Sequence, residues 1–587
     1  MEDAGGIRWP RLLEIAVVCL VLAASSWSYR GAFRCFFVQD DFAWLIISRF
    51  NTLWEYANCF LRFNPAGTFR PLSQETFFWL GQRVFGLWPP GFHIIIIAAH
   101  GAAVLLLYLL LRRFSSPLPS LVGACLYAVH GAHVTSLYWI SAFPEPLAMV
   151  FLLAAVLMFV DFDRKADLRA YAFSLAAMLL GIMAKESTLA LPLILAAYCI
   201  LRSRSRLLWT LPYFAVAGTY MLFRLISRIQ VAPYDLSLGR QTLESFCAYL
   251  SWMAGFSEYL VRSSLRGNPA MSYPWVALGF IVVVFILFMV SRDKRVAGFA
   301  LLWMVCGLQP VLYFSNHIYS YYLAPALAGL SLLIASALPP LRDFADWRRW
   351  TLSLAVAGGS LGLSHATIHP EGDWWIGRAS ARRLLIDRLL DIDRRVPAGE
   401  TAYIVGLKES EFENLEGGSV FRAFNLPMRK FRFLLPELDG ELRLKLEKLA
   451  GAGALSQAHC YIFSADEVVD QTEAFRGDPG KFLAGKPIRF LEMAGVRLDA
   501  GPEVIYRGKD SLELRTVNLG ARTIDLLYSI DGQMMPPVLQ WRLNAENAVK
   551  IFADMATPEG DYYFHAVRES GADNTRWIKI DARVTVR

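Results

Sequence analysis

Long apolar runs separated by short basic loops constrain the fold of this chain more than any other feature of its sequence. Runs of about 17–25 apolar residues are long enough to cross a bilayer. The candidates lie near residues 11–28, 92–112, 117–133, 140–161, 170–183, 187–202, 208–226, 273–291, 297–314, 320–337 and 351–367. The first follows Arg8 and Arg11 without a small-residue cleavage site, which indicates an anchor and not a signal peptide. The pattern predicts a polytopic α-helical membrane protein with about eleven transmembrane helices.

The composition excludes several other classes of protein. Hydrophobic residues make up 55% of the 587 residues and charged residues 19%, whereas a soluble protein carries about 25% charged residues. These values exclude a purely soluble enzyme and an intrinsically disordered chain. The net charge of +7 does not indicate a nucleic-acid partner, because the basic residues fall in short clusters between the apolar runs.

The Lys and Arg residues of the short loops predict the orientation, because cytoplasmic loops are enriched in them. One set of loops holds Arg112-Arg113, Arg164-Lys165 with Arg169, Arg202 to Arg206, Arg292 to Arg295, and Arg342 with Arg348-Arg349. The alternate loops carry almost none; they are residues 134–139, 184–186 and 315–319. We therefore expect the first set of loops, and the N-terminus, to be cytoplasmic.

A twelfth transmembrane span at residues 244–262 would reverse the predicted orientation of every later span and loop. It contains Glu244, Glu258 and Arg262, and is too polar for a lipid-facing helix. We expect an amphipathic helix on the outer surface instead. Eleven spans then place the C-terminal region on the external side of a bacterial inner or plasma membrane, where it would be periplasmic or extracellular.

Three domains are expected. A transmembrane domain covers residues 1–367 and includes a long external loop, residues 29–91. Residues 368–499 are richly charged and predict a mixed α/β region, with strands at 402–407 and 460–464 and a helical stretch at 437–450. Residues 500–587 predict an Ig-like β-sandwich, because several short alternating strands with turn signals are typical of that fold. The candidate strands are 504–506, 511–517, 523–529, 538–543, 548–552, 562–567 and 577–586.

Two adjacent carboxylates, Asp40 and Asp41, stand shortly after the first apolar run in an aromatic stretch, Phe37-Val-Gln-Asp-Asp-Phe-Ala-Trp44. One interpretation is the start of a helix, with Asp40 as N-cap and Asp41 favourable to the helix dipole. The other is catalysis, in which one carboxylate accepts a proton. The two interpretations do not exclude each other.

Further polar residues lie at the same external membrane edge in the predicted topology. They are His130 and His133, Glu145, Lys185-Glu186, Arg224, and Asn316-His317 with Tyr319, Tyr321 and Tyr322. Ionisable residues at membrane depth are costly and usually functional. Structural interpretations stay open, because a histidine can be an ordinary interface residue and Lys185 can be neutralised by Glu186 within one turn.

This combination supplies what transfer from a phosphate-linked donor requires. A carboxylate can accept the proton of an attacking hydroxyl, and Lys and Arg can hold a leaving phosphate. A donor with a lipid tail would reach them from the bilayer. The sequence contains no GxGxxG, Walker, HExxH or GxSxG motif, so nothing indicates a soluble nucleotide site.

Several segments in series resemble a known family. The acidic pair in the first external loop looks like that of GT-C glycosyltransferases, which use polyprenyl-phosphate sugars. The segments Phe69-Arg-Pro-Leu-Ser73, Gly91-Phe-His93 with Ala99-His100, Leu126 to Ser141, Ala184-Lys-Glu186, and Tyr220 with Arg224 are similar to motifs of the transmembrane O-mannosyltransferases that often carry tetratricopeptide repeats. The resemblance covers roughly residues 10–340. Two motif positions differ, at Gly131 and in Tyr319–Pro325, and no tetratricopeptide repeats follow.

The resemblance implies roles for individual residues. The catalytic residues would be Asp40 and Asp41, which hold the base, with Glu145 as a further acidic residue. The donor phosphate would be bound by Lys185, Arg224, His130 and His133, and the other cavity residues would be Arg70, Glu186 and Tyr322. No cofactor is certain. The Asp pair could hold Mg²⁺ or Mn²⁺, while Lys185 and Arg224 could neutralise phosphate without a metal.

The leading hypothesis is an inverting glycosyltransferase that moves a sugar from a polyprenyl-phosphate-linked donor to an acceptor hydroxyl of a protein, glycan or lipid on the external face. An oligosaccharide ligase or polymerase of the same fold is an alternative. A lipid-linked sugar transporter or flippase is another, although its polar residues would be expected near the midplane. A cell-surface binding protein would need far fewer spans.

Cys35 and Cys59 share the external loop. They are the one pair of cysteines for which a disulfide is considered, because an external compartment is oxidising.

Overall fold

The computed structural model describes most of the helical part of the chain and individual strands of the C-terminal part. The described residues are 11–64, 67–227, 239–258, 261, 273–309, 311–314, 318–339, 347–405, 418–434, 454–463, 468–477 and the strands given below beyond residue 496. They divide into two compact units, Met1–Phe36 with Phe50–Ala379, and Phe37–Arg49 with Ser380–Arg587.

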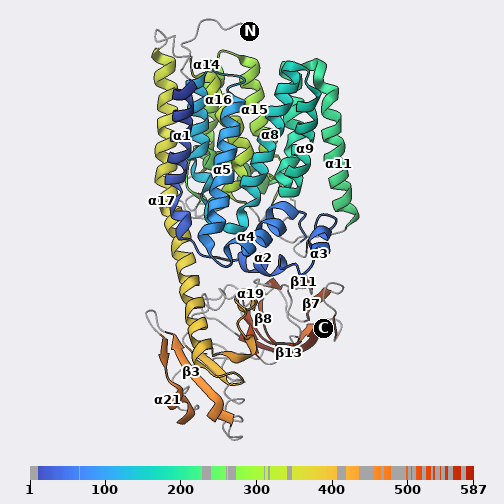
Figure 1. Ribbon diagram of the computed structural model, residues 1–587, viewed down its shortest axis with the longest axis vertical. Coiled ribbons are helices and arrows are strands. Elements are labelled where there is room, and N and C mark those ends of the chain that lie inside the picture. The colour runs from blue at the N-terminus through green and yellow to red at the C-terminus, as the bar shows by residue number, and fades with distance from the viewer. Residues whose placement is uncertain are drawn as a thin grey trace. The chain divides into compact units, whose positions relative to one another are not determined.

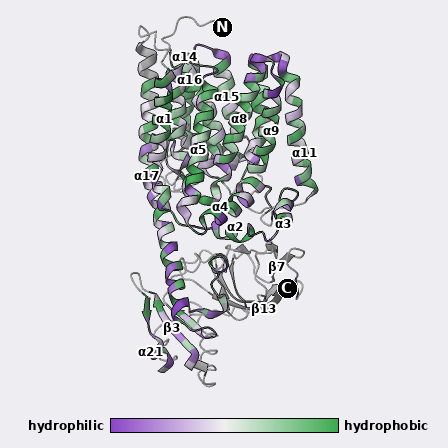
Figure 2. Cartoon of the chain, in the orientation of Figure 1, coloured by the Kyte–Doolittle hydropathy of each residue, from purple (hydrophilic) through white to green (hydrophobic). Residues whose placement is uncertain are grey.

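The first unit is built from helices that lie side by side (Figure 1). They are α1 (Arg11–Ser28), α5 (Pro89–Leu111), α6 (Pro117–Ala128), α8 (Pro144–Lys165), α9 (Leu168–Ala184), α10 (Leu191–Arg202), α11 (Leu211–Ile226), α14 (Tyr273–Val290), α15 (Lys294–Leu308), α16 (Ala324–Ala337) and the first part of α17 (Trp347–Arg395). Each predicted span overlaps one of these helices, although α6 ends at Ala128, before the end of the span predicted at residues 117–133. Figure 2 shows hydrophobic residues along most of their length.

The helices point to a membrane protein. Among the described residues, three segments are long and apolar enough to cross a membrane by length and composition, Pro89–Leu111, Ile140–Lys165 and Ser320–Ala337. Shorter apolar helices are Leu12–Ser28, Pro117–Ala128, Leu168–Ala184 and Pro274–Val290. The number of spans stays a prediction.

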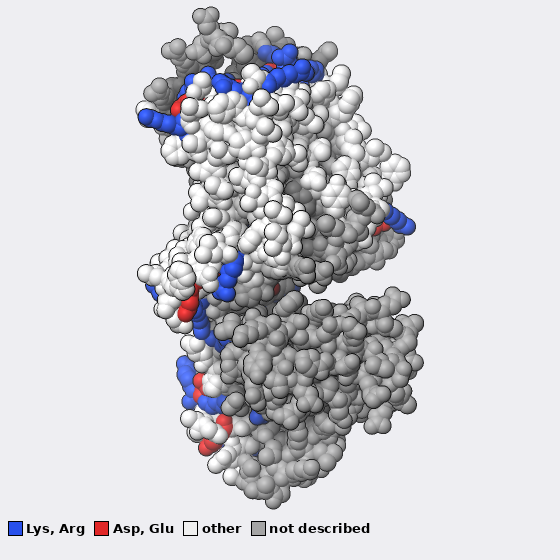
Figure 3. Space-filling model, turned by 90° about the vertical axis from the view of Figure 1, so that its right-hand side faces the viewer, with Lys and Arg blue, Asp and Glu red and all other residues white. Residues whose placement is uncertain are grey.

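Ion pairs join the loops that the sequence placed in one basic set. Arg113 pairs with Asp161 at 2.7 Å, and Arg202 pairs with Asp293 at 2.6 Å. These contacts connect the ends of α5, α8 and α10 to the start of α15. In Figure 3, Lys and Arg side chains gather at one end of the helical unit, beside a broad uncharged surface. The described loops of this set therefore lie together at one end, while Arg342 lies outside the described residues and the side of the membrane stays a prediction.

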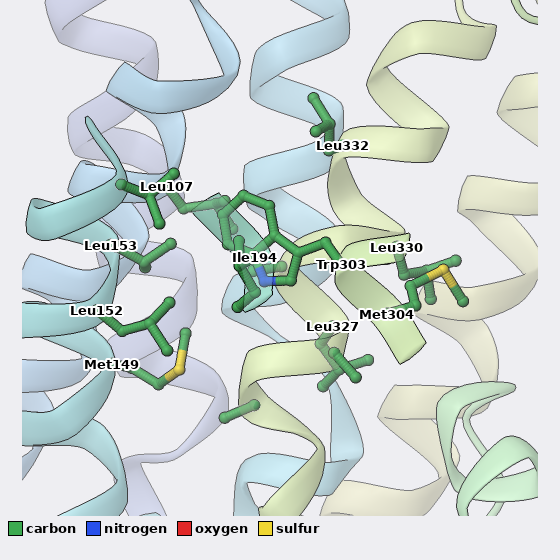
Figure 4. Close-up of a cluster of buried hydrophobic side chains, with 14 of the residues drawn as sticks. Leu107, Met149, Leu152, Leu153, Ile194, Trp303, Met304, Leu327, Leu330 and Leu332 are labelled. Atoms are coloured by element: carbon green, nitrogen blue, oxygen red, sulfur yellow. The ribbon is translucent and has the colours of Figure 1, made fainter. Parts of the chain in front are cut away.

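The core of the first unit lies between α5, α8, α10, α15 and α16. Figure 4 shows Trp303 of α15 among aliphatic side chains, and this indole is fully buried. Glycines let α15 and α16 approach closely: a Cβ atom on Gly329 would lie 2.8 Å from the Met304 nitrogen, and one on Gly307 would lie 2.7 Å from the Ala326 nitrogen. Small residues at such crossings are typical of helices packed in membranes.

Short helical segments connect the long helices at the end opposite the basic loops. They are α3 (Leu53–Asn58), the π-helix η2 (Pro71–Thr76), α4 (Phe77–Phe85), η3 (Gly131–His133), α7 (Val134–Tyr138), η4 (Ile140–Ala142), η5 (Glu186–Ala190) and η8 (Ser320–Leu323). Two further 3₁₀ segments are η1 (Arg30–Arg34) and η6 (Arg204–Thr210).

The prediction of an amphipathic surface helix at residues 244–262 was wrong. The helix α12 covers Arg240–Met253, and Tyr249, Trp252 and Met253 at its C-terminal end are buried. Their apolar rings and thioether pack into the core of the unit. Of the charged residues that suggested a surface helix, Glu244 lies in the less buried N-terminal half of α12, Glu258 follows the end of the helix, and Arg262 lies outside the described residues.

The second unit contains α2 (Asp41–Ile47), the last part of α17, α19 (Ser419–Ala423), α21 (Thr472–Gly477) and a four-stranded sheet in the order β2-β1-β3-β4. In this sheet β1 (Thr401–Val405) pairs in parallel with β2 (Phe431–Leu434) and with β3 (Ala458–Phe463), and β4 (Val468–Asp470) is antiparallel to β3. The predicted strands at 402–407 and 460–464 correspond to β1 and β3. The predicted helical stretch at 437–450 lies outside the described residues.

The strands beyond residue 496 form two further sheets. One has the order β10-β8-β12-β13-β6 with β9 beside β8, and the other has the order β11-β7-β5. Their bounds are β5 (Arg497–Asp499), β6 (Val504–Ile505), β7 (Ser511–Val517), β8 (Ile524–Ile530), β9 (Gln533–Met535), β10 (Arg542–Leu543), β11 (Val549–Phe552), β12 (Gly560–Glu569) and β13 (Trp577–Val586). Each of the seven predicted strands overlaps one of them. The β-sandwich itself stays a prediction, and the predicted domain boundary after residue 367 falls within α17.

Candidate active site

Lys185 lies in the turn that joins α9 to α10 and forms a buried ion pair with Glu145. The helix α9 ends at Ala184, and Lys185 continues in an extended conformation before η5 begins. Its Nζ lies 2.5 Å from Oε2 of Glu145, the second residue of α8, and the two side chains are 7% and 1% exposed. This contact brings together two of the residues that the sequence singled out.

Two tyrosine rings face the Lys185 ammonium. Nζ lies 4.7 Å from the ring centre of Tyr321 and 4.6 Å from that of Tyr322, both in η8. Cation–π attraction of this kind strengthens when the cation is desolvated. The ammonium is therefore held by a carboxylate and by two aromatic faces, and the predicted cavity residue Tyr322 lies next to Lys185.

Glu186 pairs with Arg70 and not with its neighbour Lys185. Arg70 donates from Nε at 2.9 Å and from Nη2 at 2.8 Å to Glu186 Oε2, and the Tyr220 hydroxyl lies 3.3 Å from Oε1. Burial raises the pKa of Glu186, but the charge and hydrogen bond of Arg70, aided by the charge of Arg224, hold it below its usual range. The interpretation of Lys185 and Glu186 as a self-compensating pair was therefore wrong.

A hydrogen bond ties the Arg70 segment to the Lys185 turn. Ser73 in η2 donates to the Ala184 carbonyl oxygen at 2.5 Å, directly before Lys185, and Arg70 directly precedes η2. Arg70, Lys185 and Arg224 supply three positive charges, against two negative charges from Glu145 and Glu186. The cluster therefore has a positive excess suited to an added anion.

His130 is fully used by backbone groups. Its Nδ1 accepts a hydrogen bond from the Ala132 N–H at 3.2 Å, so its Nε2 is left to donate to the Met253 carbonyl oxygen at 3.2 Å. The predicted role of His130 in phosphate binding therefore requires one of these bonds to break.

His133 has a different environment. Its ring centre lies 4.8 Å from that of His100 and 4.7 Å from that of Tyr127, and its Nε2 has no hydrogen-bond partner among the described residues. It belongs to η3, which contacts η8. One nitrogen of His133 is therefore buried without a polar partner among the described residues.

The acidic pair belongs to the second unit, where the two carboxylates have different surroundings. Asp41 is buried, and its Oδ2 accepts a hydrogen bond from the Val38 N–H at 2.8 Å. Asp40 occupies the N-cap position of α2 but makes no side-chain capping bond, so the capping interpretation of its side chain was wrong. The Asp40 side chain reaches solvent, while desolvation by the surrounding protein raises its pKa.

Glu75 was missed at the sequence level. It lies in the π-helix η2, its side chain is 3% exposed, and its Oε2 has no hydrogen-bond partner among the described residues. Burial raises its pKa to about 7, against the opposing effects of Asn64, Arg62 and Arg70. π-Helical turns are frequent at functional sites, but nothing in the run Arg-Pro-Leu-Ser-Gln-Glu75 predicts such a turn, so the sequence held no signal for this residue.

A polar network supports the Glu75 segment. Asn64 donates to the Thr68 hydroxyl at 2.8 Å, and Thr68 donates to Gln74 Oε1 at 2.8 Å. All three side chains are buried, so each depends on these bonds for compensation. The network links Asn64 and Thr68 to Gln74. Arg70 lies between Thr68 and Gln74, so the network helps to fix the position from which it reaches Glu186.

No group of three or more His, Cys, Asp or Glu side chains within the described ranges is placed to hold a metal ion. The divalent cation considered for the Asp pair stays a prediction. Asn316 and His317 lie outside the described residues.

Cys35 and Cys59 are buried and are not joined to each other, so the structure does not contain the disulfide that their shared loop suggested. Burial, aided by the charge of Glu75, raises the pKa of Cys59 to about 12.

The chain is similar to several solved structures, while no protein-family model and no curated protein matches it. ArnT from Cupriavidus metallidurans in the apo state is 13% identical, with 80% of this chain and 94% of that chain covered and a TM-score of 0.43. The same protein bound to undecaprenyl phosphate gives 11% identity, the same coverage and a TM-score of 0.40. The mycobacterial arabinofuranosyltransferase AftD is 13% identical, with 89% and 43% covered and a TM-score of 0.41.

Proposed function

We propose that the protein is a membrane glycosyltransferase that moves a sugar from a polyprenyl-phosphate-linked donor to an acceptor hydroxyl on the external face. The acceptor is a protein, a glycan or a lipid. The observation that carries this proposal is the cluster of Arg70, Lys185 and Arg224, which gathers more positive than negative charge at one end of an apolar helical unit.

The position of this cluster favours a lipid-linked substrate. Lys185 follows α9 and precedes α10, whose other ends carry the basic loops around Arg169 and Arg202. The cluster therefore lies at the opposite end of these helices, where a lipid phosphate at the outer membrane surface would meet it. A flippase would instead be expected to place such residues near the midplane.

The proposed reaction uses one carboxylate and the cation cluster. Asp40 accepts the proton of the acceptor hydroxyl while that oxygen bonds to the anomeric carbon of the sugar. The bond between the anomeric carbon and the phosphate oxygen breaks on the opposite face, which inverts the configuration. The electron pair leaves with the polyprenyl phosphate, and Arg70, Lys185 and Arg224 stabilise its growing charge.

The two carboxylates of the acidic pair suit different tasks. Asp41 is occupied by the Val38 N–H, which favours a structural role. Asp40 makes no capping bond, and its raised pKa moves it toward the operating range of a general base. These observations support the assignment of the base to Asp40.

The test uses purified full-length protein in nanodiscs with a panel of polyprenyl-phosphate-linked hexoses, and measures release of polyprenyl phosphate in the presence of candidate acceptors. We expect release with at least one donor, and its loss in the D40N variant. Transfer only from pyrophosphate-linked oligosaccharides would indicate a ligase. Failure of every donor, together with no binding of undecaprenyl phosphate, would rule out the proposal.

A further inference from the structure

The two ion pairs of the cation cluster differ in their access to solvent. The side chains of Lys185 and Glu145 are 7% and 1% exposed, whereas those of Arg70 and Glu186 are 12% and 22% exposed. An anion that arrives from outside therefore reaches the Arg70 guanidinium more readily than the Lys185 ammonium. Of these two cations, Lys185 is the less accessible.

Glu145 is the anion that holds Lys185 in this position. Its Oε2 lies 2.5 Å from Nζ, and the rings of Tyr321 and Tyr322 also face this ammonium. Aromatic faces attract a cation but are weak hydrogen-bond acceptors. A phosphate that binds Lys185 must therefore compete with one carboxylate for this ammonium.

Glu145 depends on Lys185 in return. The carboxylate is almost fully buried, and neither of its oxygens accepts a hydrogen bond from any other described group. A buried charge that loses its partner is strongly destabilised. Moving Lys185 from Glu145 to a phosphate is therefore opposed by the cost of leaving this carboxylate alone, and that cost lowers the affinity for the phosphate.

We propose that Glu145 is an internal competitor of the carrier phosphate for Lys185, and that it thereby weakens the hold on the polyprenyl phosphate product and speeds its release. This inference rests on the proposed function. Arg70 and Arg224 hold the phosphate first, and Lys185 joins them only when it leaves Glu145. Glu145 is then a positioning residue that acts through Lys185, and not the further catalytic carboxylate that the resemblance implied.

Binding of undecaprenyl phosphate to full-length protein in phosphatidylcholine nanodiscs tests the proposal without a donor or an acceptor. The E145Q variant keeps the size of the side chain and removes its charge. We expect it to bind about tenfold more tightly than wild type, with slower dissociation, in line with the coupling of close charge pairs. E14Q is the matched control, because Glu14 pairs with Arg112 at the basic end of the unit, and its affinity should equal that of wild type.

The K185M background separates competition from other effects. If Glu145 acts through Lys185, the gain from E145Q disappears when Lys185 is already replaced by methionine. A gain that persists in the double variant would contradict the proposal.

The remaining outcomes distinguish a failure of this inference from a failure of the proposed function. Equal or weaker binding by E145Q would overturn this inference and leave the proposed function intact, whereas absence of binding to wild type would overturn the proposed function itself. If E145Q does not fold, E145D keeps the charge and shortens the side chain, which weakens the ion pair. E145D should then bind the phosphate more tightly than wild type, and unchanged or weaker binding would count against the proposal.

Discussion

Arg70 directs two nitrogen donors at one carboxylate oxygen of Glu186, at 2.9 and 2.8 Å, across 116 positions of sequence. The contact joins the loop of residues 29–91 to the turn after α9. Lys185 is the residue next to Glu186, so the same contact places two cations of the cluster side by side. The two cations repel each other, and an anion bound between them would offset that repulsion. Arg70 would have to hold Glu186 and such an anion at the same time.

Replacing Arg70 with Lys should lower the affinity for undecaprenyl phosphate about tenfold although the charge is kept. Lys is a point charge and cannot reproduce the planar fork of Arg, so it cannot hold Glu186 and a phosphate together. Binding in nanodiscs measures the effect. R83K is the matched control, since Arg83 is an exposed arginine of the same loop that stacks on Trp79, and an equal loss in both variants would contradict the prediction.

Asp40→Asn should lower the rate of transfer by about 10²–10⁴-fold, the range typical for loss of a general base. The thermal midpoint should not change, because the Asp40 side chain makes no capping bond. Asp41→Asn should retain more activity and lower the midpoint slightly, since the amide oxygen is a weaker acceptor for the Val38 N–H than a carboxylate. The reverse order of activities would move the base to Asp41.

Glu75→Gln should stabilise the protein above neutral pH. The pKa of Glu75 is raised from 4.5 to about 7 in the fold, so the folded state favours the protonated acid. This contribution to stability is complete below pH 4.5, is lost as the pH rises to about 7, and amounts to about 3 kcal/mol. The midpoint advantage of E75Q over wild type should therefore grow between pH 4.5 and 7 and then stay constant, and an advantage that does not vary with pH would refute the shift.

Cys35 and Cys59 should not form a disulfide with each other. The intact mass should be the same with and without reductant, and alkylation should add to both residues only after unfolding, because both are buried. The raised pKa of Cys59 further slows its reaction, since the thiolate is the reactive form. A mass increase of two hydrogens on reduction would show the disulfide after all.

A cysteine introduced at position 293 should react with an impermeant maleimide only from the cytoplasmic side. Asp293 pairs with Arg202 among the basic loops, and such loops stay inside. Labelling from outside would invert the topology and place the cation cluster on the cytoplasmic face.

The sequence predicts the helices of the first unit well, because each apolar run has a length and a composition that leave few alternatives. It predicts neither the ends of α17 nor the place of α12. The polar residues after position 367 continue the same helix, and α12 buries Tyr249 and Trp252 although its first turns are polar. The hydropathy of a segment indicates whether it favours water or an apolar environment, but it does not indicate which other segments it packs against.

The site is predicted less completely, for a physical reason. The residues Arg70, Glu145, Lys185 and Glu186 were all identified, but the sequence suggests that Lys185 pairs with its neighbour. The actual partners lie 40 and 116 positions away and are brought near by the packing of α8, α9 and η2. Glu75 was missed because a glutamate in a polar run resembles a solvated one, and its burial follows only from the widened turn of η2.

That widened turn makes the spacing of the loop as important as its composition. Six residues, Pro71–Thr76, form the π-helix directly after Arg70. Deleting one of them would tighten the segment toward an α-helix, and each residue of an α-helix turns the chain by about 100°. Arg70 would then point away from Glu186 although no functional side chain had been replaced. A related chain can therefore keep every charged residue of this site and still lose the site through one deleted residue.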